Sequence, residues 1–265
     1  MQDWIVTHEP WLRLAAFAGV LLAMLAAEDL WPRRAGPLQR RLRWSANFSL
    51  VVVDALLVRL LIPLGATGTA IWSEVRGYGL FNNVGWVFAA EALLAFLALD
   101  ALIYWQHRLF HRIPLFWRLH RMHHSDVEFD ATTGVRFHPV EILLSMLIKM
   151  GAVLALGAPA VAVIAFEVAL NATSLFNHGN LRLPPPVDRA LRRLVVTPDM
   201  HRVHHSVHRH EHDSNYGFNL SWWDHLFRSY TDQPQDGHTT MQIGLASFRD
   251  PDDQRLTKLL TQPLA

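Results

Sequence analysis

Thirteen of the sixteen histidines lie between His107 and His212, in a chain of 265 residues that contains no cysteine. Eight of them form three short groups: His107-Arg-Leu-Phe-His111, His120-Arg-Met-His123-His124 and His201-Arg-Val-His204-His205. Residues at i, i+3 and i+4 share one side of a helix, so we expect each group to direct its imidazoles at a common point. Neutral nitrogen ligands of this kind suit iron, zinc, copper or nickel.

Eight imidazoles are too many for one metal ion and suit two ions with four ligands each. Four ligands leave coordination positions open for other molecules. The spacing alone does not choose among the four metals. A metal pair with open positions beside a membrane would suit the activation of oxygen on a lipid, and that reaction favours iron.

Composition favours a membrane protein. It is 51% hydrophobic and 18% charged, and its mean hydropathy is +0.13. Soluble domains keep more charge on their surfaces, so we expect an all-α, integral membrane helical bundle with a histidine-rich helical cap. The formal net charge is +1 without a long run of one sign, which argues against nucleic acid as a partner.

Three apolar segments and one apolar hairpin predict about four membrane spans. The segments cover residues 14–27, 46–66 and 85–105, and the hairpin covers about 141–176 with Gly157 and Pro159 in its middle. A single long tilted span is the alternative to the hairpin, and it would put the histidine groups on opposite faces. We expect an N-terminal transmembrane region at 1–106, a histidine-rich catalytic region at 107–230 and a polar tail at 231–265.

Basic residues next to the spans predict the orientation. Five arginines follow the first segment, whereas the loop after the second has only Arg76 against Glu74. The arginine-rich loop is therefore expected in the cytoplasm, and the histidine groups on the same side. Arginine outnumbers lysine 22 to 2, which favours a bacterial protein and hence the bacterial inner membrane.

Several further motifs accompany the histidine groups. They are Arg136-Phe-His138-Pro139-Val-Glu141, Asn177-His178-Gly179, Leu183-Pro184, Thr197-Pro198-Asp199-Met-His201, Asn215-Tyr216-Gly217 and Trp223-Asp224-His-Leu-Phe227. With the three groups, they resemble the fatty acid hydroxylase and sterol desaturase superfamily of membrane-bound histidine-box enzymes. The resemblance implies a di-iron oxidoreductase that uses dioxygen and two electrons to hydroxylate or desaturate a lipid such as a fatty acyl chain, sterol or carotenoid. It also implies that His178 is a ninth ligand.

Ligating imidazoles usually donate their second nitrogen proton to a carboxylate or carbonyl group. We expect Asp100 and Asp199 to be such partners, with Glu141 and Asp224 as further candidates. The role of His138 is open between a place near the metal and a hydrogen-bonded turn. His208, His210 and His212 fit a solvated loop, and their roles are also open.

The 265 residues show no haem, flavin or ferredoxin-like motif, so we expect a separate protein to donate electrons. Basic patches at residues 40–43 and 189–193 could bind an acidic donor or anchor the protein to the membrane surface. The alternative function is a histidine-rich metal-binding protein of the membrane, either a zinc hydrolase or a metal transporter. A zinc protease would carry His-Glu-x-x-His, and a transporter would place histidines along its spans; the sequence shows neither.

Overall fold

The fold is described from a computed structural model, and the description covers residues 2–35 and 40–265. Within these residues the chain forms helices and loops with three isolated β-bridges and no β-strand, so the predicted all-α class is confirmed. The helices are α1 (Gln2–Thr7), α2 (Glu9–Leu30), α3 (Arg40–Leu61), α4 (Gly65–Arg76), α5 (Phe81–Val84), α6 (Phe88–Arg112), α7 (Pro114–His124), η1 (Ala131–Val135), α8 (Pro139–Leu156), α9 (Ala160–Asn177), α10 (Pro185–Leu191), α11 (Pro198–His204), α12 (Arg209–His212), α13 (Trp222–Leu226), η2 (Pro251–Gln254), α14 (Leu256–Thr261) and η3 (Gln262–Leu264).

Five segments of the described chain are long and apolar enough to cross a membrane: α2, the stretch Arg40–Val84 that begins with α3, α6, α8 and α9. The three expected segments account for the first three, and the expected hairpin accounts for α8 and α9. Leu22, Leu60 and Val87 are among the large apolar side chains exposed on this bundle. Exposed leucine and valine on spanning helices are what contact with lipid tails requires.

The α8–α9 hairpin is confirmed, and the single-span alternative is wrong. Gly157 ends α8 with φ +65°, a left-handed conformation that favours glycine, and α9 begins after Pro159. A Cβ at Gly157 would also lie 2.9 Å from the carbonyl oxygen of Tyr78. The only charges of the hairpin's apolar interior, Lys149 and Glu167, form an ion pair across it.

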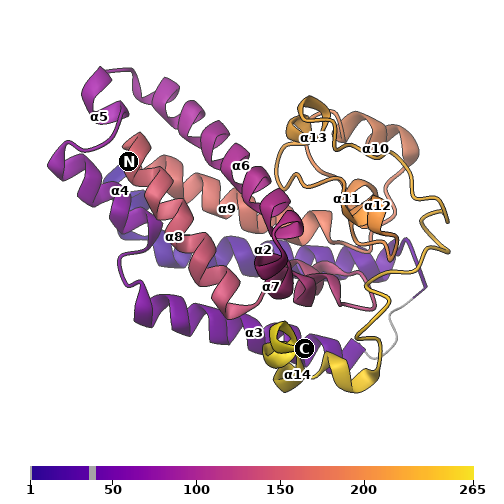
Figure 1. The fold of residues 1–265 in the computed structure, drawn as a ribbon. Helices are drawn as coiled ribbons and strands as arrows, with labels where there is room; N and C mark the ends of the chain where they lie inside the picture. The colour runs from indigo at the N-terminus through magenta and orange to yellow at the C-terminus, as the bar shows by residue number, and fades with distance from the viewer. Residues whose placement is uncertain (1, 36–39) are drawn as a thin grey trace.

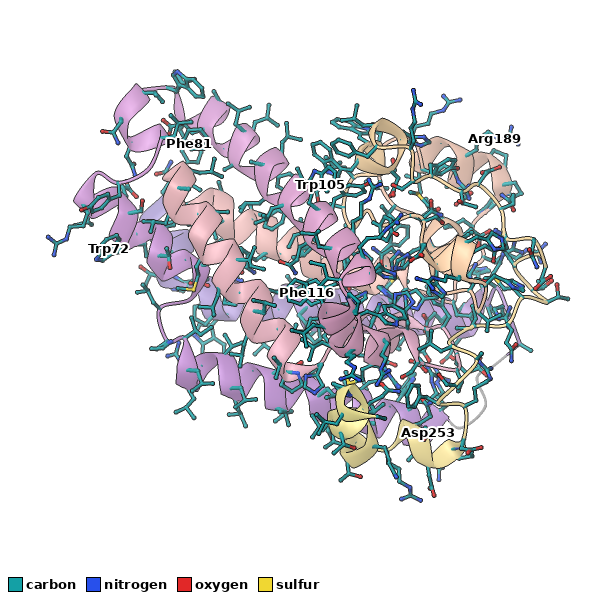
Figure 2. All side chains as sticks on the ribbon, viewed as in Figure 1. Trp72, Phe81, Trp105, Phe116, Arg189 and Asp253 are labelled. Carbon is teal, nitrogen blue, oxygen red and sulfur yellow. The ribbon has the colours of Figure 1, made fainter. Side chains whose placement is uncertain are left out.

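All the histidine groups lie at one end of the helical bundle (Figure 1), where α7, α10, α11, α12 and α13 form a cap. Figure 2 shows nitrogen-bearing side chains crowded at this end, away from Trp72 and Phe81 at the other. Glu28, near the end of α2, ties the cap to the bundle. Its Oε1 accepts hydrogen bonds from the backbone N–H groups of Ala131 (2.7 Å) and Asn180 (2.8 Å).

The expected boundaries between regions fall inside continuous structure. The division between residues 106 and 107 lies within α6, which carries the first histidine group at its end. The segment 231–265 is not a free tail, because Leu259 of α14 is fully buried against Ala46 and Leu50 of α3 and Met122 of α7. Arg121 further fixes this segment by donating to the carbonyl oxygens of Gln262 and Ala265.

A buried ion network joins the start of α3 to the loop that follows the second histidine group. Arg43 is fully buried and donates to Asp126 and Asp130 at 2.8 Å each. Burial opposes the charge of Asp126, but Arg43 and Arg136 outweigh it and lower the pKa of this carboxyl to about 2. The network therefore holds charged groups of both signs in the interior and fixes the loop beside His124.

Replacing Arg43 by methionine is expected to lower the free energy of unfolding by about 3–5 kcal/mol, because two buried carboxylates lose their counter-charge. Thermal or denaturant unfolding of the detergent-purified protein measures this. The control is Arg41→Met, since Arg41 is exposed on the same helix. A loss below about 0.5 kcal/mol for Arg43→Met, the usual range for a surface change, would contradict the role of the network.

Candidate metal centre

The nine histidines expected as ligands lie together in two buried groups. The first group holds His107, His111, His120, His124 and His204, and the second holds His123, His178, His201 and His205. Within each group, one ligand nitrogen per residue lies within 4.8 Å of all the others. The groups adjoin each other, since the ring centroids of His120 and His123 are 5.2 Å apart. The arrangement provides two nitrogen-lined sites side by side.

Each His-x-x-His-His group divides its side chains between the two sites, so the expectation of one common point per group is wrong. Residues i and i+4 of a helix point in nearly the same direction, whereas i+3 is turned by about 100° from i+4. In α7, His120 and His124 therefore face the first site and His123 the second. The order is reversed around α11, where His201 and His205 face the second site and His204 the first. The α7 and α11 segments therefore each contribute histidines to both groups.

Backbone carbonyl groups fix the tautomers of four of these histidines. The Nδ1–H groups of His107 and His204 donate to the carbonyl oxygens of Tyr216 (2.8 Å) and Ser214 (2.6 Å). In the second group, His123 and His178 donate in the same way to Arg136 (3.2 Å) and Ser174 (2.7 Å). A carbonyl oxygen can only accept, so Nδ1 must carry the proton in all four rings. Each Nε2 is then left with a lone pair.

These lone pairs face one another at short range. The Nε2 atoms of His107 and His204 are 3.0 Å apart, and those of His123 and His178 are 3.1 Å apart. Two lone pairs cannot form a hydrogen bond, and they repel at this distance unless a cation lies between the rings. The donor set therefore fits a metal ion in each group. Five and four neutral imidazoles without a thiolate suit iron, zinc, copper or nickel.

Burial keeps these ligands neutral. It lowers the pKa of His120 and of His178 to about 3. Burial first, and neighbouring histidines second, also lower the pKa of five further histidines of the two groups well below the usual range: His123, His124, His201, His204 and His205. An unprotonated imidazole is the form that binds a metal, so both sites are ready for metal at neutral pH.

Asn215 explains how two of the carbonyl groups reach their histidines. Its φ is +50°, in the left-handed region that asparagine tolerates better than most residues. This turn lies between Ser214 and Tyr216, whose carbonyl oxygens accept from two ligands of the first group. Asp224 holds the turn by accepting from the N–H groups of Tyr216 and Gly217 at 2.8 Å each. The Asn215-Tyr216-Gly217 motif is thus a support for the first site.

Glu141 is a carboxylate that contacts a proposed ligand directly, and Asp213 Oδ1 lies 3.5 Å from Nδ1 of another, His111. The Oε1 of Glu141 lies 2.7 Å from Nδ1 of His120, which leaves Nε2 of His120 for the first site. Both Glu141 and His120 are buried, and Glu141 lies in the first turn of α8, three residues after the N-cap residue His138. Glu141 therefore orients His120 and raises its basicity.

The structure corrects the two expected carboxylate partners. Asp100 shares a helix face with His107, but seven residues of helix put it about 10 Å away along the axis; it accepts instead from Trp223 Nε1 (2.8 Å) and the N–H of Leu220. Asp199 precedes His201 by two residues and points to another side of α11. It pairs with Arg202 and Arg33. Both carboxylates fix the cap and contact no ligand histidine within the described residues.

Replacing Glu141 by alanine is expected to weaken metal binding at the first site by about 10–100-fold, because His120 loses the acceptor that orients it. Metal competition with a chelator measures this. Glu141→Gln is the matched variant, since its side-chain carbonyl oxygen can still accept from His120 and should restore most of the affinity. Equal affinity in Glu141→Ala and the unchanged protein would show that Glu141 does not position a ligand.

Seven of the sixteen histidines lie outside both groups, and the sequence left the roles of four of these seven open. His138 caps α8 through Nδ1, which accepts from the N–H of Val140, and its Nε2 contacts the carbonyl oxygen of Leu260. His208 pairs with Asp236 at 2.7 Å, and the side chain of His210 is 67% exposed. His212 is buried beside the first group, where its ring stacks on Trp117. The sequence analysis did not identify Trp117 as a neighbour of the histidines. The only feature of the sequence that could have indicated it is its position three residues before His120, on the same side of the helix.

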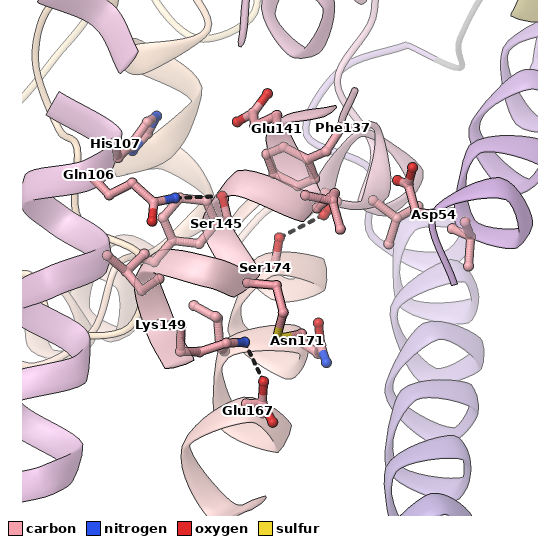
Figure 3. A pocket seen from close by; sticks show the side chains of 18 of the residues that line it. Asp54, Gln106, His107, Phe137, Glu141, Ser145, Lys149, Glu167, Asn171 and Ser174 are labelled. Carbon is pink, nitrogen blue, oxygen red and sulfur yellow. Dashed lines mark hydrogen bonds and ion pairs between the residues drawn. The ribbon is translucent and has the colours of Figure 1, made fainter. Parts of the chain in front are cut away.

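A cavity of about 400 Å³ leads from the first site into the apolar bundle (Figure 3). His107 and His120 line one end, and Lys149 and Glu167 line a deeper part. The walls between them are largely apolar. Most come from α2, α3, α6, α8 and α9, and Phe218 comes from the loop between α12 and α13; the helical wall residues include Phe17, Val51, Ile103, Phe110, Ile142, Met146 and Leu170. The volume is within the range of small-molecule sites, and apolar walls suit a hydrocarbon chain.

The sequence is similar to a family of lipid-modifying proteins and to several of its named members. Residues 92–229 match the sequence model of a family described as fatty acid hydroxylase. The ornithine lipid hydroxylase OlsE of Rhizobium tropici is 29% identical over 234 residues, which cover 88% of this chain and 69% of that protein. No solved structure matches the chain significantly.

Two animal proteins show similar identity over shorter stretches. The alkylglycerol monooxygenase of Homo sapiens is 27% identical over 165 residues, 60% of this chain and 34% of that protein. The lathosterol oxidase of Mus musculus is 28% identical over 165 residues, 59% of this chain and 52% of that protein. The chain therefore spans only about a third to a half of these two relatives.

Proposed function

The chain belongs to the fatty acid hydroxylase family of membrane oxidoreductases that act on lipids, and from this premise we propose that it hydroxylates a membrane lipid with dioxygen at a pair of iron ions. The proposed ligands are the five histidines of the first group and the four of the second. Hydroxylation is chosen over desaturation because the relative with the widest coverage of this chain among those compared is named a hydroxylase.

One observation carries the proposal: two buried groups of neutral imidazoles lie at the end of an apolar cavity inside a membrane bundle. His107 and His120 belong to the first group and also line the cavity. A lipid chain in the cavity would therefore reach the first site without crossing water. This juxtaposition is what oxidation of an unactivated C–H bond requires.

The chain's own residues have three tasks in this reaction. The apolar walls hold the hydrocarbon and exclude water, which keeps the reacting position dry. Phe137 stacks on His123 at 4.5 Å and lines the cavity, so it separates the lipid from the second group. Carbonyl groups and Glu141 hold the Nδ1 protons of the ligands away from the metals. Bound iron would supply the activation of dioxygen.

The proposed reaction needs electrons and a defined location. One oxygen atom enters the C–H bond, and the other leaves as water after taking two electrons and two protons. We propose that a separate protein donates the electrons.

We also propose that the protein lies in a bacterial inner membrane with its histidine cap in the cytoplasm, because the arginine loop after α2 contacts this cap through Arg33 and Asp199.

Metal analysis and lipid turnover of the purified protein test the proposal. Two irons per chain, and a lipid product that gains one oxygen atom from labelled dioxygen, are expected. One zinc per chain with no oxygen uptake would favour the alternative zinc hydrolase, and metal transport without a lipid product would favour the transporter. A product with a new double bond and no label would correct hydroxylation to desaturation. Comparing the lipids of a host with and without the gene would identify the substrate.

A further inference from the structure

Trp117 connects the first histidine group to the protein surface. It lies on α7 and is half-buried. Its ring centroid lies 5.0 Å from that of His111, 5.5 Å from His124 and 6.5 Å from His120. Most other rings that contact the first group are buried, including Phe110, Tyr216 and Phe218. Trp117 is therefore a side chain that touches three proposed ligands and also reaches the outside.

His212 extends this connection. Its ring stacks on Trp117 at 5.6 Å with an angle of 13° between the planes, and it lies 6.0 Å from His124 and 6.2 Å from His111. The Nδ1 of His212 contacts the carbonyl oxygen of Ser206 at 3.2 Å, which fixes the ring. These two flat rings thus contact the first group and lie outside the lipid cavity, whose lining includes neither of them.

Three arginines lie close to Trp117 and His212 along the chain. Arg118 follows Trp117, Arg112 precedes α7, and Arg209 begins α12 three residues before His212. All three are exposed, and the side chain of Arg209 is 85% exposed. Arg112 and Arg118 form no ion pair among the described residues, whereas Arg209 meets Asp213 at 3.5 Å. The positive charge of this patch is therefore mostly uncompensated within the chain.

The two basic patches expected from the sequence are less suited to a partner. Arg43 of the first patch is fully buried between Asp126 and Asp130, and Arg40 pairs with Asp29. In the second patch, Arg192 is buried against Asp188. These arginines already serve the fold, and neither patch has an aromatic ring that reaches a histidine group in the described structure.

We propose that the Trp117–His212 surface, with Arg112, Arg118 and Arg209, is the docking site of an acidic one-electron carrier protein, and that Trp117 relays its electrons to the first metal site. This rests on the proposed function. Two successive encounters each oxidise one donor and deliver one electron, which together balance the two electrons that reduce the second oxygen atom to water. A small charged patch suffices, because electron-transfer encounters bury little area and rely on charge complementarity.

The test uses an acidic plant-type two-iron, two-sulfur ferredoxin as the probe and the full-length protein in detergent. Binding of the oxidised ferredoxin is measured by titration, and electron transfer by stopped-flow oxidation of the reduced ferredoxin. Arg118→Glu/Arg209→Glu is expected to weaken binding at least about tenfold at low salt. The matched control, Arg189→Glu/Arg193→Glu, reverses two exposed arginines of the same cap and should leave binding unchanged.

Trp117→Leu is expected to keep the metal content and, because the arginines provide the charge complementarity, most of the binding affinity, but to slow electron transfer at least about tenfold. Trp117→Phe, which retains a ring, should restore much of the rate. If Trp117 had only a structural role, Trp117→Leu would lower the metal content as well as the transfer rate. Trp117→Phe would then not restore the transfer rate independently of the metal content.

The outcomes separate this proposal from the proposed function. Unchanged ferredoxin binding in the Arg118/Arg209 variant overturns the docking site. The docking site is also overturned if the variant keeps its affinity for ferredoxin but loses affinity for vesicles of anionic lipid, because the patch would then be a membrane contact. Full transfer rate in Trp117→Leu overturns the relay. If the docking site or the relay is overturned in this way but a small chemical reductant still supports formation of the lipid product, the proposed hydroxylase function stands. Absence of iron or of lipid product contradicts the proposed function. The binding titration still tests the docking site in that case, because it does not depend on lipid oxidation.

Discussion

Replacing His204 by alanine is expected to remove the metal of the first site and to abolish lipid oxidation. His204 is fully buried, and its Nε2 faces that of His107 at 3.0 Å. Losing a direct ligand should cost more than the about 10–100-fold that loss of an outer partner costs. We therefore expect about one metal ion per chain in place of two, and a turnover reduced by more than about a hundredfold. Elemental analysis and product formation by the purified variant measure these effects.

Two further variants make this prediction specific. His201→Ala removes a ligand of the second group on the same helix, α11, and should likewise leave about one ion, but at the other site. His210→Ala is the control, because His210 is exposed and lies outside both groups. Two ions in either ligand variant, or loss of metal in His210→Ala, would show that the grouping of the histidines does not correspond to metal sites.

The histidine spacing identified eight of the nine clustered residues, and the family resemblance added His178, but neither predicted how the nine divide between two groups. A period of 3.6 residues brings i, i+3 and i+4 to one side of a helix, and this predicted correctly that the three motifs converge. Whether His123 shares a site with His124 depends on where a second helix lies, because the two side chains diverge by about 100°. The position of α11 relative to α7 follows from tertiary packing, which local spacing does not encode.

The partners of the ligands were harder to predict than the ligands. Four of the Nδ1 groups donate to backbone carbonyls, such as that of Tyr216 for His107, and a carbonyl carries no side-chain signal. Asp100 was chosen because it shares a helical face with His107, but the helix rise separates them. Glu141 lies 21 residues from His120 along the chain, and only the turn between α7 and α8 brings them together. In contrast, Gly157 and Pro159 marked the hairpin correctly, because turn chemistry is local.

Replacing Ser145 by tryptophan is expected to stop lipid oxidation without removing metal. Ser145 lies on α8 in the cavity wall, between Glu141 near the histidines and Lys149 deeper in the bundle (Figure 3). Its hydroxyl accepts from Gln106 Nε2 at 2.6 Å. An indole ring there would occupy much of a cavity of about 400 Å³ and block a hydrocarbon chain. We expect turnover of Ser145→Trp to fall at least about a hundredfold, which product analysis measures.

Ser145→Ala distinguishes a blocked cavity from a lost hydrogen bond. It removes the contact with Gln106 but adds no volume, so its turnover should stay within about fivefold of the unchanged protein, since one such bond is worth about 1 kcal/mol. Both variants should retain full metal content, because Ser145 contacts no histidine in the described structure. Normal lipid oxidation by Ser145→Trp at full metal content would mean that the substrate reaches His107 and His120 by a route other than this cavity. Loss of metal would instead mean that the added ring distorts α8 and displaces Glu141 from His120.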